Sequence, residues 1–264
     1  MNSLQEAQNE ANKCLNCKVP MCQKGCPIST HIPQFIEQIK NGNLEEAYKI
    51  LQENNIMSNI CSNVCPYEEC CVGNCIKGIK GEPIQVNKLE KYVNNWARKN
   101  NVIYVNERQK SNNIKIAVVG SGPAGIECAV ELSKKGFEVT IFEKEEEIGG
   151  LLTYGIPGFR LPRDITQNLT RRIKGLGINI QTNIEFGKDI TIESLKKNGY
   201  KAIFVAIGAE TASTYHLTNK ECNKIHRSDY ILKEYNAKRI INDLGNVIII
   251  GGGNVATDSA RAAI

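Results

Sequence analysis

Hydrophobic positions in the first hundred residues recur at the spacing of an α-helix, three or four residues apart. The first set consists of Ile32, Phe35, Ile36 and Ile39. Pro33 suits the first turn of this helix and Gly42 its end. We expect a second helix after Asn43, a favourable N-cap residue, and another over residues 87–99. The pattern therefore predicts a small α-helical domain over residues 1–110.

The pattern changes after the polar stretch 106–113, which we interpret as a linker. Apolar runs typical of buried strands, at residues 116–119 and 138–142, flank a predicted helix over residues 126–135. Such alternation is typical of a parallel α/β sheet, so residues 111–244 are expected to form a Rossmann-type domain. A further apolar run at 246–250 predicts a strand that begins a second Rossmann-type domain over residues 245–264. A βαβ unit takes about 30 residues, so we expect this unit to be incomplete.

The cysteines are concentrated near the N-terminus, where nine of the eleven lie within the first 75 residues. They form two runs: Cys14, Cys17, Cys22 and Cys26, then Cys61, Cys65, Cys70, Cys71 and Cys75. Closely spaced thiolates with a proline directly after a cysteine, as at Pro27 and Pro66, suit iron–sulfur clusters, which need about four soft anionic ligands each. A zinc site is the alternative, but these runs fit clusters better than a tetrahedral ion.

Composition narrows the class of protein further. The chain has 41% hydrophobic and 23% charged residues, as an ordinary globular protein has. Its net charge of +5 is spread along the chain, so we expect no nucleic-acid binding. No apolar run approaches the roughly 18 residues that predict a membrane span. With no signal-peptide pattern and an odd number of cysteines, a reducing cytoplasm fits better than a secreted disulfide scaffold.

Two glycine-rich turns predict dinucleotide binding. The first, residues 120–125, follows a predicted strand and opens a helix, where glycine permits a tight turn and close approach of a pyrophosphate. Glu143 ends the next strand and is placed to accept hydrogen bonds from ribose hydroxyls. We expect a bound dinucleotide here in preference to a plain tight turn. The second turn, Gly251 to Ala256, is a GxGxxA variant after the apolar run 246–250.

Together these motifs resemble the small, β-type subunit of NADPH-dependent glutamate synthase. Its relatives are the large subunit of the bifurcating NADH-dependent ferredoxin:NADP oxidoreductase and the N-terminal half of dihydropyrimidine dehydrogenase. The resemblance runs from about Glu10 to the last residue. Besides the cysteine runs, its most specific parts are residues 81–92, residues 149–162, which resemble a flavin-contacting loop, and residues 206–209, which resemble the strand-end turn of the flavin domain. Residues 211–243 match the family poorly.

The resemblance implies two [4Fe-4S] clusters. Carried over position by position, the ligands of the first are Cys14, Cys17, Cys22 and Cys75. Those of the second are Cys26, Cys65, Cys71 and the non-cysteine ligand Glu90. Cys61 and Cys70 are left over, and Cys70 could compete with Cys71 as a ligand. For Cys128 and Cys222 we expect simple burial or exposure.

The resemblance also implies FAD and NADP(H). The residues implied for FAD are Gly120, Ser121, Gly122, Pro123, Ala124, Gly125, Glu143, Gly150, Leu151 and Arg160. Those implied for NADP(H) are Gly251, Gly253, Asn254 and Val255. The cofactors carry such chemistry, so we expect no catalytic acid or base. His31, His216 and His226 lie outside the motifs, and we expect ordinary surface or capping roles for them.

The function implied is an oxidoreductase in which NADPH reduces the flavin and the clusters pass electrons singly to a partner. The partner would be the glutamate synthase large subunit or another electron-accepting protein. The alternatives are the corresponding subunit of a transhydrogenase or of a pyrimidine-reducing enzyme. An alternative of another class is a truncated cluster-binding module without catalysis of its own.

Overall fold

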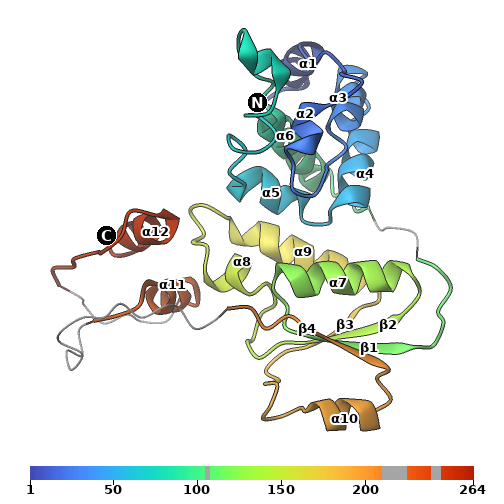
Figure 1. Ribbon diagram of the computed structural model, residues 1–264, viewed down its shortest axis with the longest axis vertical. Coiled ribbons are helices and arrows are strands. Elements are labelled where there is room, and N and C mark those ends of the chain that lie inside the picture. The colour runs from blue at the N-terminus through green and yellow to red at the C-terminus, as the bar shows by residue number, and fades with distance from the viewer. Residues whose placement is uncertain (105–107, 210–224, 239–244) are drawn as a thin grey trace. The chain divides into compact units, whose positions relative to one another are not determined.

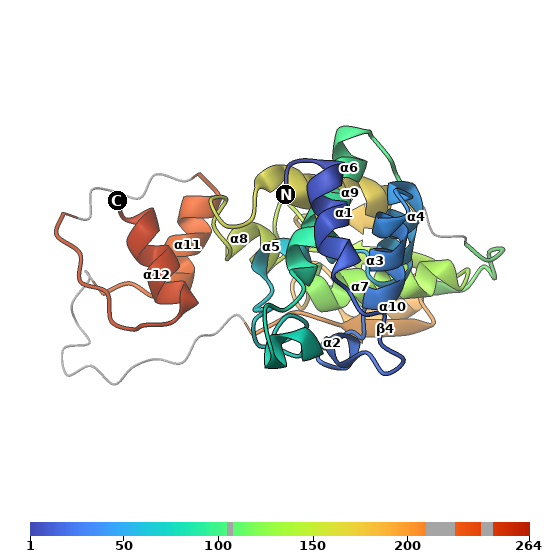
Figure 2. The same ribbon diagram turned by 90° about the horizontal axis from the view of Figure 1, so that it is seen from above.

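The computed structural model describes residues 1–104, 108–209, 225–238 and 245–264 (Figures 1 and 2). The chain divides into two compact units, residues 1–107 and residues 108–264, and each has a buried apolar core of its own. His216, Cys222 and most of the poorly matching segment 211–243 lie outside the described residues. The finer domain boundaries at residues 110 and 244 stay predictions.

The described part of the N-terminal unit consists of helices joined by loops (Figure 1). They are α1 (Leu4–Asn12), α2 (Met21–Lys24), α3 (Ile32–Lys40), α4 (Leu44–Asn54), α5 (Ser58–Val64), the 3₁₀ helix η1 (Ile76–Ile79) and α6 (Val86–Lys99). The apolar faces predicted for α3, α4 and α6 pack together with α1 in one core, in which Phe35 and Leu89 are fully buried. The amphipathic spacing is therefore confirmed as the signal for these helices.

Helix termini differ from the sequence prediction in one detail. Asn43 occupies the N-cap position of α4, but its side chain makes no capping bond and donates instead to Gln38 Oε1 at 3.3 Å. Gly42 just before it has φ +78°, a conformation that favours glycine and lets the chain turn between α3 and α4. The turn and the N-cap position were thus predicted correctly, whereas the capping hydrogen bond from the Asn43 side chain does not form.

The cysteines lie in and around the loops that join these helices. Cys14, Cys17 and Cys26 flank α2, and Cys71 and Cys75 lie in the irregular stretch between α5 and η1. Several of these partly buried thiols pack against the edge of the helical core. Loop backbone leaves thiols free to converge on one point, and the helices fix where the loops begin and end.

The C-terminal unit contains a four-stranded parallel sheet with the order β3-β2-β1-β4. Its strands are β1 (Lys115–Val119), β2 (Glu138–Phe142), β3 (Asn179–Gln181) and β4 (Ala202–Val205). In register, Ala117 of β1 lies opposite Thr140 of β2 and Ile203 of β4. β1 and β2 are buried over nearly their whole length, as strands of a covered parallel sheet are.

Helices cover both faces of this sheet (Figure 1). α7 (Pro123–Lys134) and α9 (Arg163–Gly175) lie on one face, and α10 (Ile192–Lys197) lies on the other, where Leu195 packs against Ala117 and Phe142. The short helix α8 (Leu151–Tyr154) follows β2. The helical domain followed by a Rossmann-type domain confirms the predicted fold class. No helix in the described segments is long and apolar enough to cross a membrane.

The predicted strand at 246–250 is wrong. These residues form no strand in the structure, and Ile248 and Ile250 are 90% and 69% exposed. An apolar run becomes a strand only when a neighbouring strand pairs with it, and no described strand does so here. The helix predicted after the second glycine turn does form, as α12 (Asn254–Ala262), and it packs against α11 (Ser228–Asn236) (Figures 1 and 2).

Candidate cofactor-binding sites

Four thiols of the N-terminal unit line one pocket. They are Cys14, Cys17, Cys22 and Cys75, here called the first thiol group. The rest of the lining is mostly apolar and includes Leu15, Met21, Ile32 and Ile76. The pKa of the Cys22 thiol is raised to about 11, first by burial and also by the neighbouring thiols of Cys75, Cys14 and Cys17. The structure therefore brings together the four residues predicted for the first cluster.

The second predicted ligand set also converges. It consists of Cys26, Cys65, Cys71 and Glu90, here called the second donor group. Burial raises the pKa of Cys71 to about 12, and the next contributions come from Glu90, Cys26 and Cys65. Cys26 in turn donates to Thr30 Oγ1 at 3.3 Å. Two loops and helix α6 supply this group, so it forms only when the unit is folded.

The two left-over cysteines lie on the Cys65 side of this group. The pKa of Cys65 is raised to about 12, first by burial and then by Cys70 and Cys61. Asn55 Nδ2 lies 3.3 Å from the sulfur of Cys61 and donates to it. Glu90 is among the neighbours of Cys71. The choice of Cys71 as the ligand stays a prediction, and this placement is consistent with it.

Glu90 is held by a buried hydroxyl. Ser58 Oγ donates to Glu90 Oε1 at 2.7 Å, which lowers the pKa of the carboxyl. Burial is the larger effect and raises this pKa to about 7. An enclosed carboxylate among thiols is a donor of the kind that iron accepts.

The donor sets suit a cluster better than a single ion. In the described part of the chain, no group of three or more His, Cys, Asp or Glu side chains is arranged to hold one metal ion. Zinc needs its four ligands within about 2.3 Å of one point. A [4Fe-4S] cluster is larger, so its ligands stand further apart. Two sets of four soft or anionic donors, most of them on loops and two of them, Cys22 and Glu90, on helices α2 and α6, fit the group that the sequence predicts.

The first glycine turn has the geometry that its motif requires. Gly120 has φ +98°, and a Cβ there would lie 2.3 Å from the carbonyl oxygen of Ala206. A Cβ on Gly125 would lie 2.1 Å from the carbonyl oxygen of Gly120. Gly122, by contrast, has open space around it and forms the N-cap of α7 without a side-chain bond. The free N–H groups of the first turn of α7, which Pro123 begins, can bind an anion such as a pyrophosphate.

Glu143 has hydrogen bonds within the protein that the sequence did not predict. Its buried carboxylate accepts hydrogen bonds from the backbone N–H of Ser121 at 2.9 Å and from the Ser121 hydroxyl. The other oxygen accepts from the backbone N–H of Glu145 at 2.9 Å. Glu143 therefore fixes the glycine turn against the end of β2, and contact with a ribose stays a prediction.

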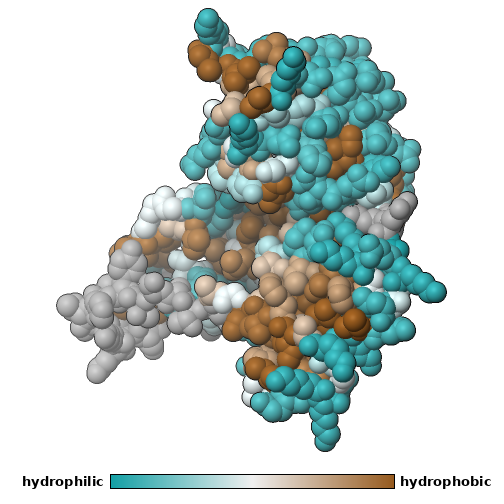
Figure 3. Space-filling view, turned by 45° about the vertical axis from the view of Figure 1, so that its right-hand side comes forward, coloured by the Kyte–Doolittle hydropathy of each residue, from teal (hydrophilic) through white to brown (hydrophobic). Residues whose placement is uncertain are grey.

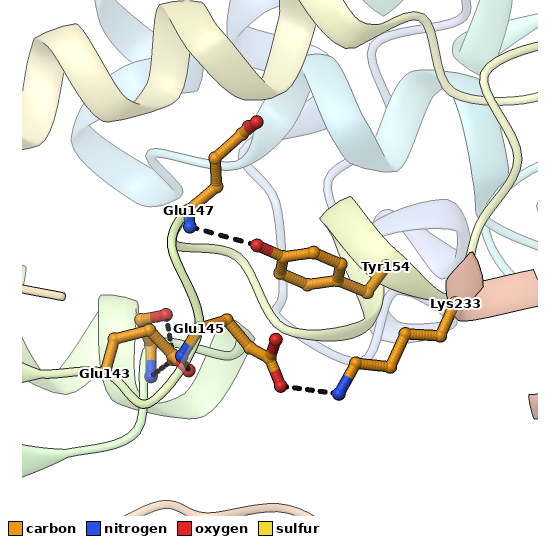
Figure 4. A network of polar contacts seen from close by, with 6 residues as sticks. Glu143, Glu145, Glu147, Tyr154 and Lys233 are labelled. Atoms are coloured by element: carbon orange, nitrogen blue, oxygen red, sulfur yellow. Dashed lines mark hydrogen bonds and ion pairs between the residues drawn. The ribbon is translucent and has the colours of Figure 1, made fainter. Parts of the chain in front are cut away.

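The predicted flavin loop lies beside this turn. The backbone N–H of Gly149 donates to the carbonyl oxygen of Ser121 at 3.0 Å, and a Cβ on Gly150 would lie 3.0 Å from the Cα of Gly122. Leu151, the first residue of α8, is exposed. Figure 4 shows how the loop is held: Glu147 N donates to the Tyr154 hydroxyl at 3.0 Å, and Glu145 pairs with Lys233 of α11 at 2.5 Å.

Arg160 faces α12. Its guanidinium pairs with the buried carboxylate of Asp258 at 2.6 Å, and the guanidinium of Arg261 lies 3.8 Å from the centre of the Phe159 ring. Residues 149–162 are thereby joined to the helix that follows the second glycine turn. Contact of Arg160 with flavin stays a prediction.

The second glycine turn is open. Gly251 has φ +134°, and Cβ atoms on Gly252 or Gly253 would meet nothing within 4 Å. Gly253 is the N-cap of α12 without a side-chain bond, Asn254 begins the helix, and Val255 is exposed. The apolar residues that precede the turn, Val247, Ile248 and Ile250, are exposed too, as are Phe204 and Val205 at the end of β4. Figure 3 shows apolar patches exposed on one face of the molecule. This geometry is compatible with the predicted NADP(H) role but is less enclosed than the first turn.

Other polar residues of these sites were not predicted from the sequence. Ser58, Asn94 and Gln52 form a buried chain behind Glu90, and Asp258 and Lys233 hold the flavin loop. Asn94 and Gln52 lie on buried helix faces that are mostly apolar. A polar residue at such a position is the one sequence feature that could have pointed to them. Of the described histidines, His31 occupies the N-cap position of α3, and His226 stacks on Tyr230.

Comparison with known proteins agrees with this arrangement. Residues 1–102 match the family described as dihydropyrimidine dehydrogenase domain II, 4Fe-4S cluster. Residues 114–264 match the pyridine nucleotide-disulphide oxidoreductase family. The matches confirm the predicted resemblance and the predicted cofactor classes, namely [4Fe-4S] clusters, FAD and NADP(H).

The chain is 32% identical to the glutamate synthase [NADPH] small chain of Azospirillum brasilense, over 98% of this chain and 56% of the relative. It is 34% identical to the NAD-dependent dihydropyrimidine dehydrogenase subunit PreT of Escherichia coli O157:H7, over 96% of this chain and 61% of the relative. It thus spans little more than half the length of these relatives.

Among solved structures, Mycobacterium tuberculosis FprA in complex with NADPH shares the fold. It has a TM-score of 0.51 and 24% identity, over 57% of this chain and 36% of FprA. With this fold, the first glycine turn and the two converging donor groups, the chain belongs to the pyridine nucleotide-disulphide oxidoreductase family and carries an N-terminal 4Fe-4S domain of the dihydropyrimidine dehydrogenase kind.

Proposed function

We propose that this chain is the electron-input subunit of a glutamate synthase of the NADPH-dependent type. In such a protein NADPH supplies a hydride, FAD accepts it, and [4Fe-4S] clusters carry the electrons singly to a partner. The observation that carries the proposal is the convergence of the first thiol group and the second donor group in one helical unit. Similarity to the Azospirillum small chain supports the glutamate synthase type.

The chain's own residues would bind and orient the cofactors. The open N-terminus of α7 would hold the FAD pyrophosphate, while Glu143 keeps the glycine turn in place. The second glycine turn, at the N-terminus of α12, would hold NADP(H). The first thiol group and the second donor group would ligate one cluster each. No side chain is assigned as a catalytic acid or base.

A second candidate is the corresponding subunit of a pyrimidine-reducing enzyme. The PreT relatives match this chain at 34% identity, which is as strong as the match to the glutamate synthase small chain. The two candidates differ in the partner. For the first, the partner is the glutamate synthase large subunit, and for the second it is a pyrimidine-reducing subunit. We propose a cytoplasmic location for either complex.

Anaerobic purification with quantification of iron, acid-labile sulfide and flavin tests the proposal. We expect about eight irons, as two [4Fe-4S] clusters require, and about one FAD per chain. Addition of NADPH should bleach the flavin absorbance. Iron without flavin would support the cluster-binding module instead, and zinc in place of iron and sulfide would contradict electron transfer altogether.

Identification of the partner separates the two candidates. Affinity purification of the tagged chain from its own host should recover the electron-accepting subunit. Formation of glutamate from glutamine and 2-oxoglutarate by that complex would support the first candidate. Reduction of uracil or thymine would support the second.

A further inference from the structure

A chain of buried polar side chains leads through three helices to Glu90. It consists of Gln52 on α4, Ser58 on α5, and Asn94 and Glu90 on α6. Gln52, Ser58 and Asn94 are 0%, 1% and 2% exposed. Buried polar groups in an apolar helical core destabilise the fold unless they are hydrogen-bonded. Their presence in this core therefore calls for an explanation.

The hydrogen bonds fix the direction of this chain. Asn94 Nδ2 donates to the backbone oxygen of Glu90 at 2.9 Å, and a carbonyl oxygen can only accept, so the orientation of the amide is settled. The second N–H of the same group donates to Ser58 Oγ at 2.9 Å. Asn94 Oδ1 accepts from Gln52 Nε2 at 3.1 Å. Gln52 Oε1 is then left buried without a partner.

This order determines what Ser58 does. Because its oxygen accepts from Asn94, its one hydroxyl proton points to Glu90 Oε1, at 2.7 Å. Among the described residues, only Ser58 donates to the Glu90 carboxylate. The second carboxylate oxygen of Glu90 therefore remains able to bind a metal. Glu90 is also a neighbour of Cys71, a predicted ligand of the second cluster.

We infer that Ser58 is a positioning residue for Glu90 as the non-cysteine ligand of the second cluster, with Asn94 and Gln52 holding the Ser58 hydroxyl in place. The inference rests on the proposed function, because it requires a cluster at the second donor group. Groups that hydrogen-bond to a metal ligand orient it and tune the metal. A hydrogen bond to the ligand oxygen withdraws electron density, so it should raise the reduction potential of that cluster only.

The test is a potentiometric titration of the holoprotein, followed by electron paramagnetic resonance. Wild-type protein should show two cluster signals. Ser58→Ala should move one of the two midpoint potentials to a more negative value and leave the other in place. Ser62→Ala is the matched control, because Ser62 lies on the same helix, is equally buried, and donates to the backbone oxygen of Asn59 at 3.0 Å. It should change neither potential.

Four results would overturn the inference. Ser58→Ala with both clusters present and both potentials unchanged would exclude a positioning role. Equal shifts in the Ser58→Ala and Ser62→Ala variants would show a general loosening of α5. Wild-type protein without iron and sulfide would contradict the proposed function itself, so the two failures can be told apart. If Ser58→Ala does not fold, Asn94→Leu should shift the same potential, and an unchanged value would count against the inference.

Discussion

At the scale of single residues, Gly122 differs from the glycines on either side of it in what a side chain would meet. Gly120 and Gly125 exclude a Cβ because backbone oxygens lie within 2.3 Å of its position. Gly122 has nothing within 4 Å, and its φ of −66° is open to any residue. No atom of the protein therefore fills the space beside Gly122. A pyrophosphate that approaches the turn would occupy this space.

Gly122→Ala should therefore fold as the wild type does but bind FAD at least tenfold more weakly, about 1.4 kcal/mol in binding free energy. The added methyl group would occupy the space where the phosphate approaches the N-terminus of α7. Flavin content after gel filtration and a fluorescence titration with FAD measure the effect. Gly175→Ala is the control, since a Cβ there also meets nothing within 4 Å. Unchanged FAD affinity in Gly122→Ala would contradict a flavin site at this turn.

Glu127 on α7 carries a buried carboxylate oxygen, Oε2, that has no hydrogen-bond partner. Burial raises the pKa of this carboxyl above its ordinary value of 4.5. The folded protein therefore binds more protons than the unfolded chain between pH 4.5 and the raised pKa, and stability falls as pH rises through that interval. Above it, the carboxylate is charged and destabilising.

Glu127→Gln should remove this dependence. At pH 8 the variant should be more stable than the wild type by about 1 kcal/mol, because a neutral amide replaces an unpartnered charge. Below pH 4.5 the two should be nearly equal, since the carboxyl is then largely protonated in the folded protein. Thermal unfolding of both proteins between pH 4 and 8 measures this. A variant that is less stable at pH 8 would show that the carboxylate has a favourable partner in solution.

At the scale of elements, α12 is held to the flavin loop by few contacts. The Arg160–Asp258 ion pair is half-enclosed, with the Asp258 side chain 6% exposed, and Arg261 lies over Phe159. A partly buried ion pair contributes more than a surface pair, because removal of one partner leaves the other charge poorly solvated. The docking of α12 should therefore depend on Asp258.

Asp258→Asn should speed amide hydrogen exchange of residues 254–262 about tenfold, which corresponds to about 1.4 kcal/mol of local stability. Mass spectrometry of peptides from this region measures the rate. Asp229→Asn is the control, because Asp229 pairs with Arg227 at an exposed position in α11. Surface pairs contribute little, so exchange in α12 should not change. Equal acceleration in both variants would contradict a specific role of the Arg160–Asp258 pair.

The elements show what the sequence could predict and what it could not. Strand β2 was predicted with its observed bounds, because a short run rich in Val, Ile, Thr and Phe and a following acidic residue are local signals. The run 246–250 has equally local signals but forms no strand, because pairing depends on a neighbour elsewhere in the chain.

The contact of Ser58 with Glu90 spans 32 residues and that of Gln52 with Asn94 spans 42, so no local pattern contains them. Glu143 was singled out correctly by position, but its bonds to Ser121 depend on how the turn folds back.

At the scale of the whole molecule, the two units have different sources of stability. The sheet unit has buried strands with helices on both faces, and its one described cysteine, Cys128, is only partly buried. In the N-terminal unit, partly buried thiols of Cys14, Cys22, Cys26, Cys71 and Cys75 pack against the helical core. Much of the chain that bears them is irregular. Bound clusters would therefore stabilise the first unit by cross-linking its loops, as structural metals do in small domains.

Removal of iron by a chelator under reducing conditions should accordingly unfold much of the N-terminal unit and leave the sheet unit folded. We expect part of the far-ultraviolet helical signal to be lost while bound FAD is retained, because the elements that support the turn at Gly120 to Gly125, among them β1, β2, α7 and the residue after β4, belong to the sheet unit. Circular dichroism and flavin quantification on the same sample measure both. Gly122→Ala is the converse control, since it should lose flavin and retain iron. Loss of FAD in step with iron would contradict independent units and would mean that the clusters also stabilise the flavin domain.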